Sequence, residues 1–427
     1  MRVPPFAALA TILAASLLAT PAARAQDRPE RTQVRRESSC VTCHRDLEEP
    51  LARSVTLYAE DVHGVKGFDC VACHGGDGTA SEKAAAKDPF KGYAGTPKGE
   101  AILRVCGRCH SDAAFMKRHN PSLRVDQVAE YRTSVHGQRL LEYGDSSVAT
   151  CASCHSPHDI RPPSDPKSSV HPLQVVETCG RCHGDAAYMG AYRIPTDQVE
   201  KYKRSVHWQT LSVKGDLSAP TCNDCHGNHG AAPPEIEWIG NVCGQCHSVM
   251  ADLFAQSVHA TAFIRLGTPG CATCHLNHEI REASDEMLTP EPPGVCADCH
   301  RRTSRQGLTI LRVRALLDSL RNAYERADSL LWFAERAGME VSQAQFELNN
   351  AHSALVMARA AVHSFQVDSI QAAVNDGLEI AAGATERGQR ALKQLEFRRT
   401  GLTLSVVVIV LLIAGLSLKI RQLERKG

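Results

Sequence analysis

The chain has 427 residues, with 48 Lys and Arg against 47 Asp and Glu, for a formal net charge of +1. This balance gives no support for a nucleic-acid-binding protein, which is usually strongly basic. The length allows two or three domains. Only 5% of the residues are aromatic, so a large core of aromatic side chains is not expected, and something other than side chains is expected to fill part of the interior.

The N-terminal segment, residues 1–25, has the pattern of a secretory signal peptide. Arg2 precedes an apolar run from Phe6 to Leu18, and small residues follow at 23–25. The run is short for a membrane anchor, which disfavours the alternative of an uncleaved helix. We therefore predict export of the chain and cleavage before Gln26.

Residues 26–300 hold every cysteine of the chain. All 18 fall in pairs spaced C-x-x-C, and a histidine directly follows each pair. The pairs are Cys40 and Cys43, Cys70 and Cys73, Cys106 and Cys109, Cys151 and Cys154, Cys179 and Cys182, Cys222 and Cys225, Cys243 and Cys246, Cys271 and Cys274, and Cys296 and Cys299. The histidines are His44, His74, His110, His155, His183, His226, His247, His275 and His300.

C-x-x-C-H is the attachment sequence of c-type haem. The two thiols form thioethers with the haem, and the adjacent histidine is the proximal ligand of the iron. Zinc sites or redox-active cysteine pairs would not require a histidine after every pair. The sequence therefore predicts nine covalently bound c-type haems.

The motifs are arranged in repeats. Residues 106–158 and 179–229 share one order: a C-x-x-C-H motif, a Val-His pair, and a second motif followed by x-x-His. A third copy spans 243–278 and a degenerate one spans 40–77. The last motif, at 296–300, opens a unit that does not continue. About 30 residues per motif is too little for separate domains, so we expect the haems to pack together and form much of the core.

A second histidine on the iron makes an electron carrier, whereas an open position allows a substrate to bind. The repeated Val-His position supplies the distal candidates His63, His136, His207 and His259, and the x-x-His position supplies His158, His229 and His278. His171 stands alone before Cys179 and is a further candidate. His119 aligns with Tyr192 of the next copy, so we interpret it as a surface residue.

Residues 301–399 contain no cysteine and no proline, and apolar residues recur at helical spacing. We predict a long helical hairpin or three-helix bundle, with helices up to Gly338, near Val341–Phe365 and near Ser369–Phe397. The first is expected to pack through Leu308, Leu311, Ala315, Leu316, Leu320, Ala323 and Leu330. A spacer or dimerising stalk is the alternative role for this region.

The same helical region offers a ninth distal candidate. His352 and His363 lie eleven residues apart, close to three helical turns, so they share a face of a continuous helix. We favour His363 over His352. The alternative is that either histidine sits at the edge of an ordinary core.

Residues 400–418 carry no charge, and basic residues flank them on both sides. This length crosses a bilayer. With an exported N-terminal part, residues 419–427 form a cytoplasmic tail, in agreement with the positive-inside rule. The expected location is therefore the periplasmic side of the bacterial inner membrane, with a single span. Between signal and span we expect a mostly α and irregular haem-packed domain with few strands, short helices near Val125–Val135 and Gln198–Val206, and then the helical region.

Segments such as SVHGQRLLEYGDSSVATCASCHSPHDIRPP and GDLSAPTCNDCHGNHGAAPP resemble the multihaem c-type cytochromes grouped as cytochrome c3-like or double-C-x-x-C-H proteins, in a membrane-anchored form with nine haems. The resemblance implies electron transfer between a membrane quinol-oxidising partner and a periplasmic or extracellular acceptor. The alternative is a multihaem reductase of a small nitrogen or sulfur oxyanion (nitrite, hydroxylamine or tetrathionate type) at one five-coordinate haem. The C-x-x-C-K site of the related nitrite reductases does not occur here.

Overall fold

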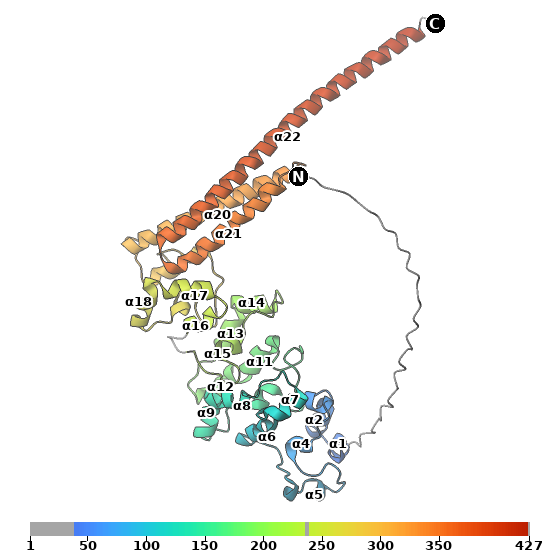
Figure 1. Cartoon of the computed structure of the whole chain (residues 1–427), viewed down its shortest axis with the longest axis vertical. Helices are drawn as coiled ribbons and strands as arrows, with labels where there is room; N and C mark the ends of the chain where they lie inside the picture. The colour runs from blue at the N-terminus through green and yellow to red at the C-terminus, as the bar shows by residue number, and fades with distance from the viewer. Residues whose placement is uncertain (1–37, 235–238, 426–427) are drawn as a thin grey trace, which may run out of the picture.

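The computed structural model describes residues 38–234 and 239–425. The expected signal peptide at 1–25 and its cleavage site lie outside the described residues, as do residues 426–427. All regular elements within the described ranges are helical, with no strand among them. This agrees with the mostly helical fold expected from the sequence (Figure 1).

The motif-bearing region is a succession of short helices joined by irregular segments. Its α-helices are α1 (Ser39–Arg45), α2 (Leu51–Tyr58), α3 (Val62–Val65), α4 (Val71–His74), α5 (Lys83–Ala86), α6 (Glu100–His110), α7 (Ala113–His119), α8 (Gln127–Thr133), α9 (Val135–Glu142), α10 (Cys151–His155), α11 (Pro172–His183), α12 (Ala186–Gly190), α13 (Gln198–Lys203), α14 (Val206–Ser212), α15 (Cys222–His226), α16 (Ile239–Gly244), α17 (Ser248–Ala255), α18 (Val258–Leu266) and α19 (Gly270–His275). The 3₁₀ helices are η1 (Pro89–Lys91), η3 (Asp285–Met287) and η4 (Val295–Asp298).

The helices expected before the Val-His pairs are present but shorter than predicted. α8 ends at Thr133 and α13 at Lys203, and new helices begin at Val135 and Val206. Ser134 and Ser205 stand between the two helices in each case and cap the second one. A serine at an N-cap satisfies a backbone donor that the helix leaves free, which explains why the chain starts a new helix at each pair.

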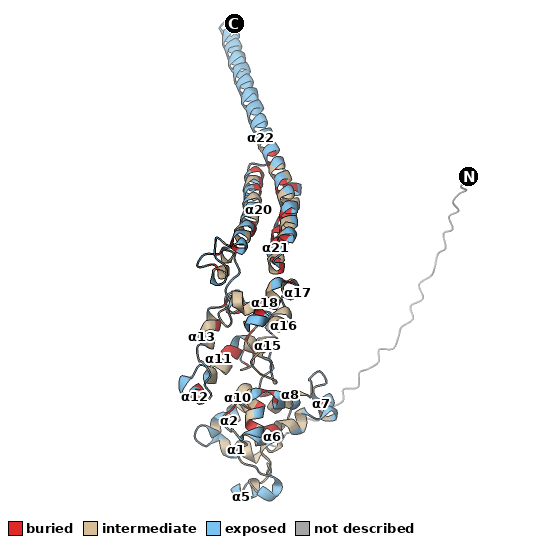
Figure 2. Cartoon of the chain, turned by 90° about the vertical axis from the view of Figure 1, so that its left-hand side faces the viewer, coloured by how far each residue is buried: buried red, intermediate tan, exposed pale blue. Residues whose placement is uncertain are grey.

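Side chains alone form little core in this region. One compact cluster of buried residues lies around α6, α8 and α9, made of Leu103, Tyr131, Leu140 and Val148. Figure 2 shows mostly half-buried residues elsewhere around the motifs. Protein interiors are close-packed, so a region of this composition needs further material in its centre.

The C-terminal region is a three-helix bundle of α20 (Arg305–Arg336), α21 (Ser342–Ala361) and α22 (Val367–Glu424), with η5 (Val362–Ser364) between the last two. Buried residues recur with alternating steps of three and four along each helix. In α22 they are Ile370, Val374, Gly377, Ala381, Ala384, Gly388 and Ala391. This spacing is the heptad pattern of helices wound around each other. Many of these residues are alanine or glycine, so the helices approach closely.

The predicted contact stripe of the first helix is wrong for most of its residues. Of that stripe only Leu320 is buried, and Leu308 is 60% exposed. α20 instead buries Val313, Leu317, Leu320, Ala327, Leu331 and Ala334 together with Gly307. The buried face passes through alanines that a search for leucines overlooks. Helix α20 has apolar residues on more than one face, and packing against α21 and α22 selects one of them.

Helix α22 continues without interruption from the bundle through the expected span to Glu424. It contains an 18-residue window of mean hydropathy 2.6, none of which is buried. Figure 2 shows this part exposed along its whole length, beyond the ends of α20 and α21. By length and composition this helix could cross a membrane.

The bundle is joined to the motif region through η3. The carboxylate of Asp285 accepts hydrogen bonds from Arg359 Nε at 2.9 Å and from Arg359 Nη2 at 2.7 Å. Arg321 Nη1 lies 3.3 Å from the same carboxylate. Asp285 itself is 5% exposed, so this ion-pair group links a loop of the motif region to two helices of the bundle.

Candidate haem sites

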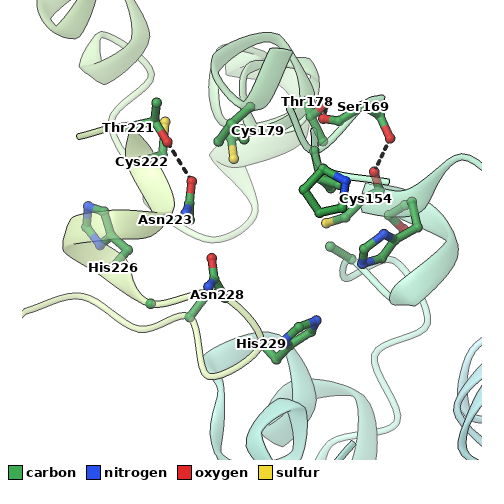
Figure 3. Close-up of a pocket in the computed structure, with 18 of the residues that line it drawn as sticks. Cys154, Ser169, Thr178, Cys179, Thr221, Cys222, Asn223, His226, Asn228 and His229 are labelled. Carbon is green, nitrogen blue, oxygen red and sulfur yellow. Dashed lines mark hydrogen bonds between the residues drawn. The ribbon is translucent and has the colours of Figure 1, made fainter. Parts of the chain in front are cut away.

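The motifs of the N-terminal region surround one continuous cavity of about 3220 Å³. Residues from each of the nine C-x-x-C-H motifs line it. In Figure 3, Cys179 and Cys222 lie near each other on one side of this space, while His226 and His229 lie along the loop that follows the motif at Cys222. The cavity therefore occupies the place where side chains form little core.

Eight of the nine motif histidines lie opposite a second histidine. The ring centroids of the pairs are 5.9–6.4 Å apart. The pairs are His63–His110, His74–His158, His136–His183, His155–His229, His207–His247, His226–His278, His259–His300 and His275–His363. Each pair joins a motif histidine to one of the predicted distal candidates.

This separation fits an iron between the two rings. A metal–imidazole nitrogen bond is about 2.0–2.1 Å long, so two imidazoles on opposite sides of one metal place their centroids about 6 Å apart. Direct stacking of two rings with nothing between them would bring them closer. The donor set of two thiols and two imidazoles at each site therefore fits a covalently attached, six-coordinate haem.

The distal histidines of the Val-His pairs are held by buried N-caps. Asp61, Ser134, Ser205 and Ser257 precede the pairs and cap the helices that carry His63, His136, His207 and His259. The first three caps are fully buried. Each cap oxygen accepts a backbone N–H of the first helical turn, which orients the histidine on that turn.

The x-x-His candidates sit in tight turns after the motif helices. His158 and His278 have φ of 73° and 60°, the left-handed region that non-glycine residues seldom adopt. Backbone bonds tie each turn to the Val-His segment of the unit before it. Val62 N–H donates to Ile160 O at 2.9 Å, and Val206 N–H to Ile280 O at 2.9 Å. Two distal histidines are thus positioned together at each junction between units.

Ring orientation and burial also suit metal binding. His74 Nδ1–H donates to Gly95 O at 2.8 Å, His226 Nδ1–H to Ala232 O at 3.1 Å, and His363 Nδ1–H to Ala360 O at 3.0 Å. Such a bond leaves Nε2 with its lone pair for the metal. Burial, with a smaller contribution from the facing ring, lowers the pKa of His110 and His136. Neutral imidazole is the form that binds iron.

The motif sulfurs show the order of the sites in space. Within a unit, hydrogen bonds join Cys106 to Cys151, Cys179 to Cys222, and Cys243 to Cys271, and Cys40 lies within electrostatic reach of Cys70. Between units, the same reach joins Cys73 to Cys109, Cys154 to Cys179, Cys225 to Cys246, and Cys274 to Cys296. Each motif thus neighbours the motifs before and after it in the sequence, and the sites form one line.

Three histidines outside the motifs do not face a motif histidine. His171 caps α11, and its Nδ1 accepts Leu173 N–H at 3.2 Å, which in a neutral ring leaves the proton on Nε2. The structure therefore does not bring this predicted ligand to a motif. His119 lies against Phe115 and His352 against Tyr324.

The sequence reasoning did not assign the pairs. Each Val-His histidine faces the first motif of the following unit, and each x-x-His histidine faces the second motif of the preceding unit. His363 completes this scheme from η5, opposite His275. His44 is the exception, since no imidazole lies opposite it among the described residues. The absence of x-x-His after the second motif, where Asp77 stands instead, was a signal that the first unit differs.

Two family models match parts of the chain. Residues 216–301 match the model described as cytochrome c3, and residues 12–75 match that of cytochrome c554 and c-prime. With the motifs and the paired histidines, these matches support a multihaem c-type cytochrome with covalently bound haem.

Two curated relatives come from Shewanella baltica (strain OS185). The chain is 25% identical to the "Multiheme cytochrome MtrA" over 224 residues, which cover 49% of this chain and 52% of the relative. It is 28% identical to the "Multiheme cytochrome MtrC" over 135 residues, which cover 29% of this chain and 19% of the relative. The chain thus spans about half the length of the first relative and less of the second. No solved structure matches.

Proposed function

We propose that this chain is a membrane-anchored electron-transfer protein in which nine covalently bound haems form a single line. The observation that carries the proposal is the set of eight facing imidazole pairs. An iron with imidazole on both sides has no position for a substrate, so it can pass electrons but not bind small molecules. The proposed distal ligands are His63, His136, His158, His207, His229, His259, His278 and His363.

The order of the motif sulfurs supports electron flow along the sequence order of the sites. Figure 1 shows α1, α4 and α5 at the end of the molecule opposite the bundle, and α16 to α18 next to it. The last sites would therefore lie nearest the membrane and the first site farthest from it. Covalent attachment at both thiols of each motif keeps the neighbouring haems at constant separations.

We assign residues 26–300 to the haem domain, 301–399 to the helical domain and 400–418 to the membrane span, with a cytoplasmic tail at 419–427. The haem domain then stands on the periplasmic side of the bacterial inner membrane. Its proposed partners are a membrane quinol-oxidising cytochrome at the bundle end and a periplasmic or extracellular acceptor at the far end. The exposed apolar part of α22 supports the anchor.

One observation favours the reductase of a small nitrogen or sulfur oxyanion as a second candidate. His44 faces no imidazole, so the first haem is the one site where an open coordination position would be expected. The eight closed sites would then supply electrons to it. This candidate requires that no other residue of the chain binds the first iron.

Mass spectrometry and low-temperature electron paramagnetic resonance of the purified full-length protein test the main proposal. The mass should exceed that of the polypeptide by nine haems. His207→Ala should convert one haem from low spin to high spin, because it removes the imidazole opposite His247. The matched control His352→Ala, which alters a histidine that faces no motif, should leave the spectrum unchanged. A bare polypeptide mass, or a His207→Ala spectrum equal to wild type, would contradict the proposal.

A further inference from the structure

The first site, at Cys40 and His44, differs from the other eight. This inference rests on the proposed set of nine haems. All 20 histidines belong to the part of the chain that the structure describes, since residues 1–37, 235–238 and 426–427 contain none. Sixteen form the eight pairs, and His119, His171 and His352 lie elsewhere. No histidine is therefore left for the iron held by His44.

The repeat explains why this site lacks a histidine. The first motif of each later unit faces the Val-His pair of the unit before it, and the residues before Cys40 contain no such pair. The sixth ligand of this haem, if the chain provides one, must come from a different residue type and a different segment. The segment at hand is 83–95, which contains α5 and η1.

This segment is fastened to the neighbouring motif. Asp77 N–H donates to Ala86 O at 3.0 Å and Gly76 N–H to Lys91 O at 3.0 Å. Lys91 Nζ pairs with the Asp77 carboxylate at 2.7 Å. The first motif is tied to the same turn, because Ser39 N–H donates to Gly78 O at 2.8 Å. Segment 83–95 therefore has a defined position relative to both of the first two sites.

Lys87 occupies the C-cap of α5 in this segment. Both Lys87 and His44 line the cavity. After burial, the charge of Lys87 is the largest influence that lowers the pKa of His44, ahead of His74. His110, His136, His155 and His275 feel their facing histidines in the same way. Lys87 thus bears the electrostatic relation to His44 that a distal histidine bears to its motif.

The amine of Lys87 lacks a polar partner. Lys91 pairs with Asp77, and Lys66 Nζ donates to His119 O at 3.0 Å. In the described part of the chain, the contact of Lys87 Nζ is with the ring of Tyr93, at 5.8 Å from its centroid. An amine turned toward a largely apolar cavity is costly unless something there binds it. Its nitrogen lone pair can be given to a metal.

We propose that Lys87 Nζ is the sixth ligand of the haem bound at Cys40–His44. The line then ends, on the side away from the bundle, in one His/Lys iron, while the other eight are His/His. A lysine amine on a flexible four-carbon stem is less firmly placed than an imidazole in a capped turn. The terminal haem is therefore the site of the line at which the distal ligand exchanges most readily.

Electron paramagnetic resonance of the ferric, full-length holoprotein tests this assignment. Wild-type protein should show no high-spin signal equivalent to one haem, and Lys87→Ala should convert one haem of the nine to high spin. Lys87→His should stay low spin, with one additional His/His signal in place of the His/Lys signal. The matched control is Lys83→Ala, in the same helix and lining the same cavity, which should leave all signals unchanged.

Three results would overturn the assignment. A wild-type high-spin signal of one full haem would mean an open site and would favour the reductase. A Lys87→Ala spectrum equal to wild type would exclude Lys87 as a ligand. If Lys87→Ala protein loses the haem, an unchanged spectrum of Lys87→His would also exclude it. The haem count by mass separates the two proposals: nine haems with no effect at Lys87 contradicts this assignment alone, and fewer than nine haems in wild type contradicts the proposed function.

Discussion

The motif region and the helical bundle are both helical, but different interactions hold them together. In the bundle, two clusters of buried residues run along the three helices, from Val313 to Ala391. In the motif region, one cluster of four residues surrounds Leu103, and the centre is a cavity lined by cysteines and histidines. Secondary structure content therefore says little about the source of stability.

The two regions also repeat in different ways. The bundle repeats every seven residues, because helix geometry brings the same face back to the interface. The motif region repeats a unit of about 70 residues that carries two sites, and its units are linked through ligand pairs that cross from one unit to the next. Loss of one element should therefore spread further in the motif region than in the bundle.

The largest effect is expected when the haems are withheld. Full-length chain produced without haem attachment should lose the structure of residues 38–300, because neither a side-chain core nor the iron bonds remain to offset the chain entropy. The bundle should keep its structure. Limited proteolysis with mass spectrometry should give fragments throughout the motif region and a protected piece within 305–399. Equal protease resistance of the two regions would contradict the contrast between them.

A smaller effect, confined to the bundle, is expected from Gly377→Leu. A Cβ at Gly377 would lie 2.7 Å from the methyl carbons of Leu320, which is fully buried. Overpacking of this kind costs about 1–3 kcal/mol of stability. Denaturant unfolding followed by circular dichroism should show the loss, while the haem spectrum stays as in wild type.

Gly383→Ala is the control in the same helix. A Cβ at Gly383 meets no atom within 4 Å, and replacing glycine by alanine inside a helix stabilises it by about 0.5–1 kcal/mol. The two substitutions should therefore shift the unfolding midpoint of the bundle in opposite directions. Shifts of the same sign would mean that close approach of α22 to α20 is not what places glycine at 377.

The parts of the fold that follow from local chemistry could be predicted from the sequence. The motifs name the proximal side of each site, the Val-His and x-x-His repeats name seven of the facing histidines, and glycine at 338 marks the end of the first long helix. These features depend on residues close together in the chain. The choice of His363 was also consistent with the structure, in which η5 directs it toward His275.

What could not be predicted depends on contacts between distant segments. Which histidine faces which motif is decided by bonds such as that between Val62 and Ile160, which spacing within a unit does not reveal. The buried face of α20 depends on the position of α21 and α22 around it. His171 resembles a ligand by its place before Cys179, yet its ring is used to cap α11. Lys87 carries no motif at all, and only its position near His44 draws attention to it.

The smallest effect we predict lies at the junction of the two regions. Burial raises the pKa of Asp285, but the hydrogen bonds from Arg359 and the charges of Arg359, Arg321 and Arg314 outweigh it, so that the pKa lies below its usual range. Asp285→Asn should lower stability by about 1–2 kcal/mol at pH 7, because the arginines are partly exposed and retain water. Unfolding of wild type and variant, compared by circular dichroism at several pH values, measures this loss.

The pH dependence separates an ionic link from a simple packing contact. The pKa of Asp285 is depressed in the folded state, so its contribution is fully present above the unfolded value of about 3.9 and is lost as the pH falls through the folded value. The difference between wild type and Asp285→Asn should therefore be constant near neutral pH and shrink below about pH 4. A difference that persists undiminished in acid would mean that the shape of the side chain, and not its charge, joins the bundle to the haem region.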